Sequence, residues 1–235
     1  MKEEVYSLQS AADSSVTERA GFIRRTYLHV AGAIAAFALL EAWLISAGFG
    51  ETLVSTLANT PMSWLLVMGL FIGTSFIADK FAHSQTSEGL QYFGLGLFTI
   101  AQAIVFLPII YIANEYFPGA IATSGYITAL LVIGLTSTVF ITKKDFSFMG
   151  HFLKIAFLVA FGVIVCSIIF GFTLGLVFCG VMVLLAAGSV LYNTSNILHH
   201  YHTGQHVAAA LALFSSIALL FFYVLQIVMS FSGRD

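Results

Sequence analysis

The dominant feature of the sequence is a series of seven long apolar stretches that together fill most of its 235 residues. A helix needs about 20 mainly apolar residues to cross the roughly 30 Å hydrocarbon core of a bilayer. Only 9% of the residues are charged, against about 25% in soluble domains. The sequence therefore predicts an all-α, polytopic membrane helix bundle in contact with the lipid bilayer. The predicted spans are 27–49, 62–79, 91–112, 118–141, 149–170, 172–192 and 207–231.

Turn-forming or charged residues separate the predicted spans. The most polar break is the cluster Lys143-Lys144-Asp145, and the least marked is Phe170-Gly171-Phe172. At this least marked break two alternatives stay open. The chain forms either two full spans there, or one long or re-entrant segment in a six-span protein.

The Lys and Arg residues lie at alternate breaks, and such residues favour the cytoplasmic side of a membrane. Lys80 lies in the second loop and Lys143 and Lys144 in the fourth, whereas the first, third and fifth loops contain none. Arg234, in the C-terminal tail, departs from the alternation. The pattern predicts a cytoplasmic N-terminus and, with seven spans, a C-terminus on the opposite side. Four further basic residues precede the first span: Lys2, Arg19, Arg24 and Arg25.

Three regions are expected along the chain. Residues 1–20 are polar and of mixed charge, and they lack the apolar core of a signal peptide. We expect them to form a disordered cytoplasmic tail. Residues 21–231 form the membrane domain, and residues 232–235 form a short C-terminal tail.

Glu41 is an acidic residue deep in the first span, about two thirds of the way across. Ionisable groups inside a bilayer are costly and are therefore candidates for function. No Lys or Arg lies at helical spacing from Glu41. Two alternatives stay open: a role in an ion or proton pathway, or a structural role with a partner on another helix.

Four histidines lie between the last two spans, and three of them, His199, His202 and His206, are candidate metal ligands. Zinc sites usually use Cys, Asp or Glu as well, and the stretch 191–206 contains none of these. We therefore expect an interfacial turn without a metal or any other cofactor.

Motifs for catalysis and for nucleic-acid binding are absent from the sequence. It contains no Gly-x-Ser-x-Gly, no His-Glu-x-x-His and no paired intramembrane aspartates. The basic residues form no stripe or patch of the kind that binds nucleic acid. An enzyme is not expected, nor is a nucleic-acid partner.

Four stretches resemble motifs of the Bax inhibitor-1 superfamily, over about residues 20–231. Residues 143–148 look like its Lys-Lys-Asp-(Leu/Phe)-Ser motif, and the stretch from Leu191 resembles the Leu-Tyr-Asp-Thr ending of its sixth span. Residues 207–214 resemble its last span, and residues 22–27 are similar to the start of span one in bacterial members. The positions that match the two polar motifs are Lys143, Lys144, Asp145, Ser147, Tyr192 and Thr194.

The resemblance implies a bundle in which six helices surround the seventh. Members are described as calcium-leak channels or transporters. Bacterial members are described as pH-sensitive calcium leaks or as modulators of a membrane-bound ATP-dependent protease. The resemblance thus implies Ca²⁺ or another cation, or a membrane protease, as a partner. It also implies a bacterial inner membrane location.

The resemblance further implies a gate made of two aspartates that share a proton, with a basic residue as partner. This sequence has Asn193 at the first aspartate position and Ser216, next to Ser215, at the second. The basic partner corresponds to Lys80. Two carboxylates in contact form a titratable switch, and Asn and Ser cannot titrate.

We therefore expect a weak or pH-insensitive pathway for a cation or solute, with Asn193, Ser216, Ser215, Glu41 and Lys80 as candidate pore or gate residues. Neutral oxygens are also poorer ligands for calcium than carboxylates. The alternative is a membrane regulator without transport, acting on a membrane-bound ATP-dependent protease or in a stress response.

Overall fold

The structure is a computed structural model, and it describes residues 10–58, 61–84 and 87–233. Its elements in the described residues are helices, and seven of them are long and apolar enough to cross a membrane. The prediction of an all-α, seven-span bundle is confirmed. The helices are α2 (Val16–Ser46), α3 (Phe49–Ala58), α4 (Pro61–Ala82), α5 (Glu88–Tyr116), α6 (Ala120–Thr142), α7 (Met149–Phe170), α8 (Leu176–His199) and α9 (His206–Ser232).

The first span begins earlier than the sequence predicted. Ser15 caps α2, its side chain accepting from the backbone of Glu18 while the Glu18 carboxylate accepts from the backbone of Ser15. This reciprocal pairing satisfies free N–H groups of the first turn. Ala11 is fully buried, and its N–H donates to the carbonyl of Tyr201 at 2.8 Å. The expectation of a disordered tail is therefore wrong for residues 10–20, and residues 1–9 lie outside the described part of the chain.

The least marked break separates two full spans. Helix α7 ends at Phe170, Gly171 takes a left-handed conformation with φ of 71°, and α8 begins at Leu176. A left-handed residue after the last turn ends a helix, and glycine adopts it without steric cost. The six-span alternative is thereby excluded. The structure also adds α3, a ten-residue helix in the first break that the sequence did not predict.

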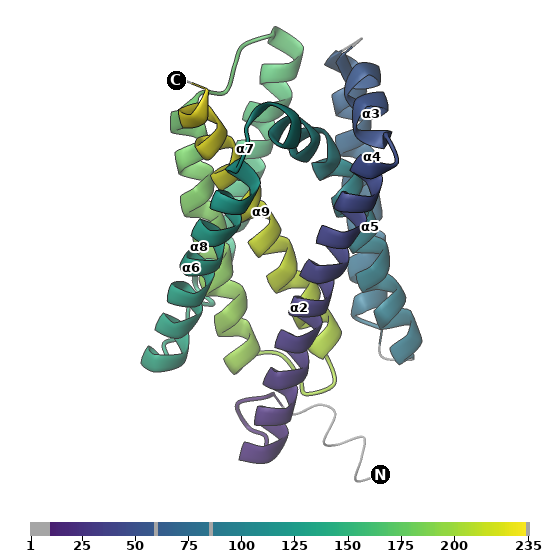
Figure 1. Ribbon diagram of the computed structural model, residues 1–235. Coiled ribbons are helices and arrows are strands. Elements are labelled where there is room, and N and C mark those ends of the chain that lie inside the picture. The colour runs from purple at the N-terminus through teal and green to yellow at the C-terminus, as the bar shows by residue number, and fades with distance from the viewer. Residues whose placement is uncertain (1–9, 59–60, 85–86, 234–235) are drawn as a thin grey trace.

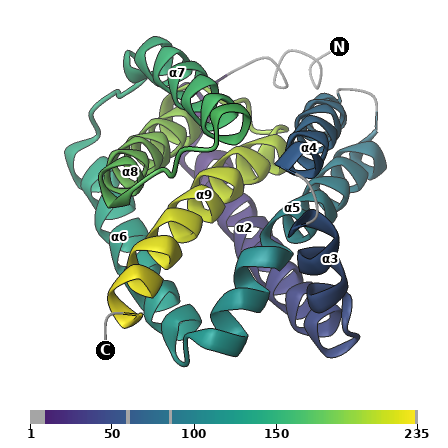
Figure 2. The ribbon, with the colours of Figure 1, turned by 90° about the horizontal axis from the view of Figure 1, so that it is seen from above.

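Helix α9 runs obliquely through the middle of the bundle, as Figures 1 and 2 show, and it packs against α2, α4, α5, α6 and α8. Its Phe214 ring lies 5.9 Å from that of Phe98 on α5 and 6.2 Å from that of Phe37 on α2. Helix α7 packs mainly on α8 and α4, and it reaches α9 through a small cluster that includes Ala160 and Tyr223. The expected arrangement of six helices around the seventh is confirmed.

The outer faces of the spans are apolar and unpacked. Leu130 on α6, Leu158 on α7 and Leu184 on α8 are each at least 70% exposed. In water such surfaces would aggregate, whereas in a bilayer they are solvated by acyl chains.

The interior of the bundle is packed with small residues. The first turns of α9 carry three fully buried alanines, Ala208 to Ala210. Small side chains let helix backbones approach closely in lipid.

Candidate functional site

Asn193 on α8 and Ser216 on α9 are in direct contact. The Asn193 side chain donates from Nδ2 to Ser216 Oγ at 2.7 Å and to the carbonyl of Ala212 at 3.1 Å. Ser216 Oγ in turn donates to the same carbonyl at 3.2 Å. Ser216 is 5% exposed, and Asn193 is partly buried. Two residues that the sequence pairs only by resemblance thus form one neutral hydrogen-bonded contact between the central helix and its neighbour.

The other residues expected at this contact lie elsewhere. Ser215 directly precedes Ser216 in α9 and is partly buried. Lys80, near the end of α4, is exposed, and its Nζ lies 5.8 Å from the ring centroid of Phe76 in the same helix. Lys80 therefore does not join the Asn193–Ser216 contact.

Glu41 faces the interior of the bundle rather than lipid. It is 3% exposed, and neither carboxylate oxygen has a hydrogen-bond partner among the described residues. It lines a cavity of about 600 Å³ whose walls come from α2, α5, α6 and α9. Thr128 of α6 lines the same cavity, and its hydroxyl is also buried without a partner in the described part of the chain.

The Glu41 cavity and the Asn193–Ser216 contact meet at α9. Phe214 and Ile217 both line the cavity, and they lie on either side of Ser216 in the sequence. The hydrogen bond from Asn193 therefore holds α9 in place next to the residues with which this helix lines the cavity.

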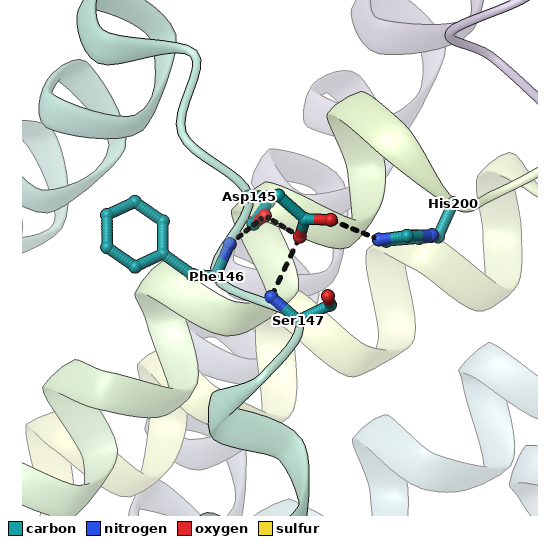
Figure 3. Close-up of polar contacts among 5 residues, drawn as sticks. Asp145, Phe146, Ser147 and His200 are labelled. Atoms are coloured by element: carbon teal, nitrogen blue, oxygen red, sulfur yellow. Dashed lines mark hydrogen bonds and ion pairs between the residues drawn. The ribbon is translucent and has the colours of Figure 1, made fainter.

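The Lys-Lys-Asp motif fastens the loop between α6 and α7 to the end of α8 (Figure 3). Asp145 Oδ1 accepts from the backbone N–H of Ser147 at 2.8 Å, and Asp145 Oδ2 lies 3.0 Å from His200 Nε2. Ser195 of α8 bridges the loop: its hydroxyl donates to Asp145 at 3.2 Å and accepts from the N–H of Phe146 at 2.8 Å. Hydrogen bonds from Ser147, its backbone N–H first, and from His200 lower the pKa of Asp145 to about 2.

The remaining motif residues serve packing or remain exposed. Tyr192 lies against Gly150 of α7, where a Cβ would come within 2.9 Å of the tyrosine ring. Thr194 is fully buried in α8, whereas Lys143 and Lys144 are exposed. Sequence reasoning missed His200 and Ser195 as partners of Asp145. The spacing Asp-x-Ser could have indicated the bond within the loop, but 50 residues or more separate Asp145 from the other two.

The histidines do not gather into a metal site. In residues 10–58, 61–84 and 87–233, no group of three His, Cys, Asp or Glu is placed to hold a metal ion. His206 is buried, and its ring lies 5.0 Å from that of His29 on α2. His202 instead donates its backbone N–H to Gln205 Oε1 at 3.1 Å, within the turn.

Seven apolar helices, one of them enclosed by the others, define an integral membrane protein of the helical-bundle class. Residues 19–233 match the family model described as inhibitor of apoptosis-promoting Bax1. The chain belongs to the Bax inhibitor-1 family.

Curated relatives come from bacteria, plants and fungi. An uncharacterized protein of Pseudomonas aeruginosa is 30% identical over the full length of both chains. Protein LIFEGUARD 3 of Arabidopsis thaliana is 25% identical over 89% of this chain and 84% of its own. Bax inhibitor 1 of Schizosaccharomyces pombe is 27% identical over 73% of this chain and 64% of its own. No solved structure gives a significant match.

Proposed function

We propose that this protein is a leak pathway for a cation or a small solute, closed at the Asn193–Ser216 contact. The observation that carries the proposal is the 2.7 Å hydrogen bond between these two residues, since it joins the central helix to α8. Members of the family are described as calcium leaks gated at the corresponding positions. The proposed location is a bacterial inner membrane with the N-terminus in the cytoplasm.

The Glu41 cavity supports the proposal by supplying part of a path. It holds about 600 Å³ inside the bundle, and a carboxylate without a hydrogen-bond partner among the described residues lines it. An ionised group without a partner in a low-dielectric interior is costly. A cation that enters the cavity relieves this cost. Glu41 is thus suited to attract a positive ion toward the Asn193–Ser216 contact.

The chemistry of the contact predicts a gate that does not respond to pH. Neither an amide nor a hydroxyl changes charge between pH 5 and 8. One such interhelical hydrogen bond contributes about 0.6 kcal/mol in a membrane interior. Neutral oxygens also hold Ca²⁺ less well than carboxylates. The pathway should therefore conduct weakly and with little ion selectivity at this point.

Flux through reconstituted liposomes tests the proposal. Calcium and proton indicators enclosed in the vesicles should report flux above that of empty vesicles, with a nearly constant rate from pH 5 to pH 8. Vesicles with the protein that match empty vesicles for every cation tested would overturn the proposal. They would favour a regulator without transport, for example of a membrane-bound ATP-dependent protease.

A further inference from the structure

Two buried polar groups without partners face the same cavity from opposite helices. Glu41 of α2 is 3% exposed and Thr128 of α6 is 4% exposed. Both carboxylate oxygens and the threonine hydroxyl have no hydrogen-bond partner among the described residues. Buried polar groups are almost always hydrogen-bonded in native proteins. Two such groups without a partner in one cavity indicate that a bound ligand supplies their hydrogen bonds.

The rest of the cavity is mainly apolar and partly aromatic, with Asn114 as a further polar residue in its lining. Phe37, Phe214 and Phe221 contribute rings, and isoleucines and alanines cover much of the remaining wall. Glu41 is the one ionisable residue among those that line the cavity in the described part of the chain. The volume of about 600 Å³ lies within the range of roughly 300–1,000 Å³ that is typical of small-molecule sites.

The cavity opens toward the lipid between α2 and α6. Ile34 of α2 is 39% exposed and Ile133 of α6 is 63% exposed, and both line the cavity. These two helices each pack on α9, and the cavity lies between them. A ligand that partitions into the bilayer can therefore reach Glu41 without passing through water.

We propose that this cavity binds a lipophilic primary ammonium ion. An –NH₃⁺ group offers three donors and a positive charge, which suits the two carboxylate oxygens of Glu41 and the hydroxyl of Thr128. The apolar body of the ligand fills the isoleucine-lined and phenylalanine-lined walls, and the rings favour a nearby cation. A phosphatidylethanolamine headgroup would bring a phosphate into a cavity with no Lys or Arg in its described lining. The ligand is therefore a free amine rather than a lipid.

The inference deepens the proposed function, because it names a ligand class for the cavity that the leak pathway includes. The inference rests on the proposed function for one premise, that cations enter this cavity. Binding at equilibrium is measured without transport, so the two proposals can fail separately. Amine binding without calcium or proton flux leaves the site intact and removes the leak.

The experiment uses the full-length protein in phosphatidylcholine nanodiscs, because this lipid carries no primary ammonium. Binding of adamantan-1-amine is measured by equilibrium dialysis at neutral pH, with empty nanodiscs subtracted. The neutral adamantan-1-ol and the trimethylated ammonium derivative have the same apolar cage. The primary amine should bind at least about tenfold more tightly than either, since loss of one charge-assisted hydrogen bond has an effect of this size.

Matched variants assign the binding to Glu41. Glu41→Gln keeps the shape and should weaken amine binding about tenfold or more, with adamantan-1-ol unaffected. Thr128→Val should weaken amine binding to a smaller extent. Glu51→Gln makes the same chemical change on the exposed surface of α3 and should bind like the unaltered protein. An unchanged monodisperse elution profile shows that each variant is folded.

Three results would overturn the proposal. In the first, Glu41→Gln binds the amine as tightly as the unaltered protein. In the second, the alcohol or the trimethylated ion binds as tightly as the primary amine, which leaves only an apolar cavity. In the third, phosphatidylethanolamine in the nanodiscs weakens amine binding, which assigns the site to a lipid headgroup.

Discussion

Asn193 and Ser216 are held together by a hydrogen bond of 2.7 Å, and each of them also donates to the carbonyl oxygen of Ala212. The two side chains and one carbonyl thus form a closed, neutral network between α8 and α9. Neither side chain changes charge between pH 5 and pH 8, so the network itself is the same over this range.

Asn193→Ala should increase flux about threefold or more. The substitution removes both hydrogen bonds that Asn193 donates to α9 and leaves the Ser216–Ala212 bond, within α9, in place. A loss of about 0.6 kcal/mol for each interhelical bond corresponds to about a threefold change in an equilibrium constant. Calcium flux into proteoliposomes measures the effect. Ser215→Ala, at the partly buried neighbouring position, is the control, and an equal rise in that variant would show that the contact has no special role.

Asn193→Asp combined with Ser216→Asp should make the pathway depend on pH. At low pH the two carboxyl groups share a proton and hold α8 to α9. As the pH rises, the shared proton is lost and two like charges repel each other. Flux should therefore increase between pH 5 and pH 8 in the double variant and stay level in the unaltered protein. A flat profile in the double variant would contradict the gate assignment.

Asp145→Asn should reduce stability only above about pH 2. In the folded protein the pKa of Asp145 lies near 2, below the usual value of about 4. The ionised form therefore stabilises the fold fully above pH 4, and this contribution is lost as the pH falls toward 2. Because the side chain is nearly half exposed, the effect should stay below about 1 kcal/mol.

Thermal unfolding in detergent from pH 7 down to pH 2 measures this contribution. The difference between Asp145→Asn and the unaltered protein should shrink over the lower two pH units. Ser195→Ala removes the bridge to Phe146, which involves no titrating group, so that part of its effect should persist at all pH values. A constant difference for Asp145→Asn would contradict the stabilising role assigned to the ionised Asp145 carboxylate.

The helical spans were predictable because lipid imposes a simple rule. Every backbone polar group in a bilayer must be bonded internally, so each long apolar stretch becomes a helix. The start of α2 was predicted eleven residues too late, because the polar turns from Val16 to Arg25 are stabilised by the Ser15–Glu18 cap. Apolar residues indicate which part of a helix lies in the membrane, but they do not indicate the residue at which the helix begins.

Contacts between distant residues were harder to predict from one sequence. The Asn193–Ser216 pair was found only through the family resemblance, since 23 residues and a turn separate the two. The cavity beside Glu41 could not be predicted, because four helices must be positioned before it exists. The sequence indicated a costly acid in a span, and the packing shows that it faces inward.

The two glycines Gly94 and Gly96 of α5 should respond differently to alanine. A Cβ on Gly94 would lie 2.6 Å from the carbonyl oxygen of Ala78 and 2.8 Å from the N of Ala82, both backbone atoms of α4. Backbone cannot move aside like the end of a side chain, so Gly94→Ala must separate α4 from α5. We expect a loss of about 1–3 kcal/mol, typical of overpacking. A Cβ on Gly96 would meet no heavy atom of the described residues within 4 Å.

Gly96→Ala is therefore the matched control, with the same chemical change two residues along the same helix. It should leave the thermal midpoint unchanged or raise it slightly, because alanine favours a helix more than glycine does. Thermal unfolding of the two variants in the same detergent decides the matter. Equal midpoints would mean that α4 and α5 do not approach each other as closely as Gly94 requires.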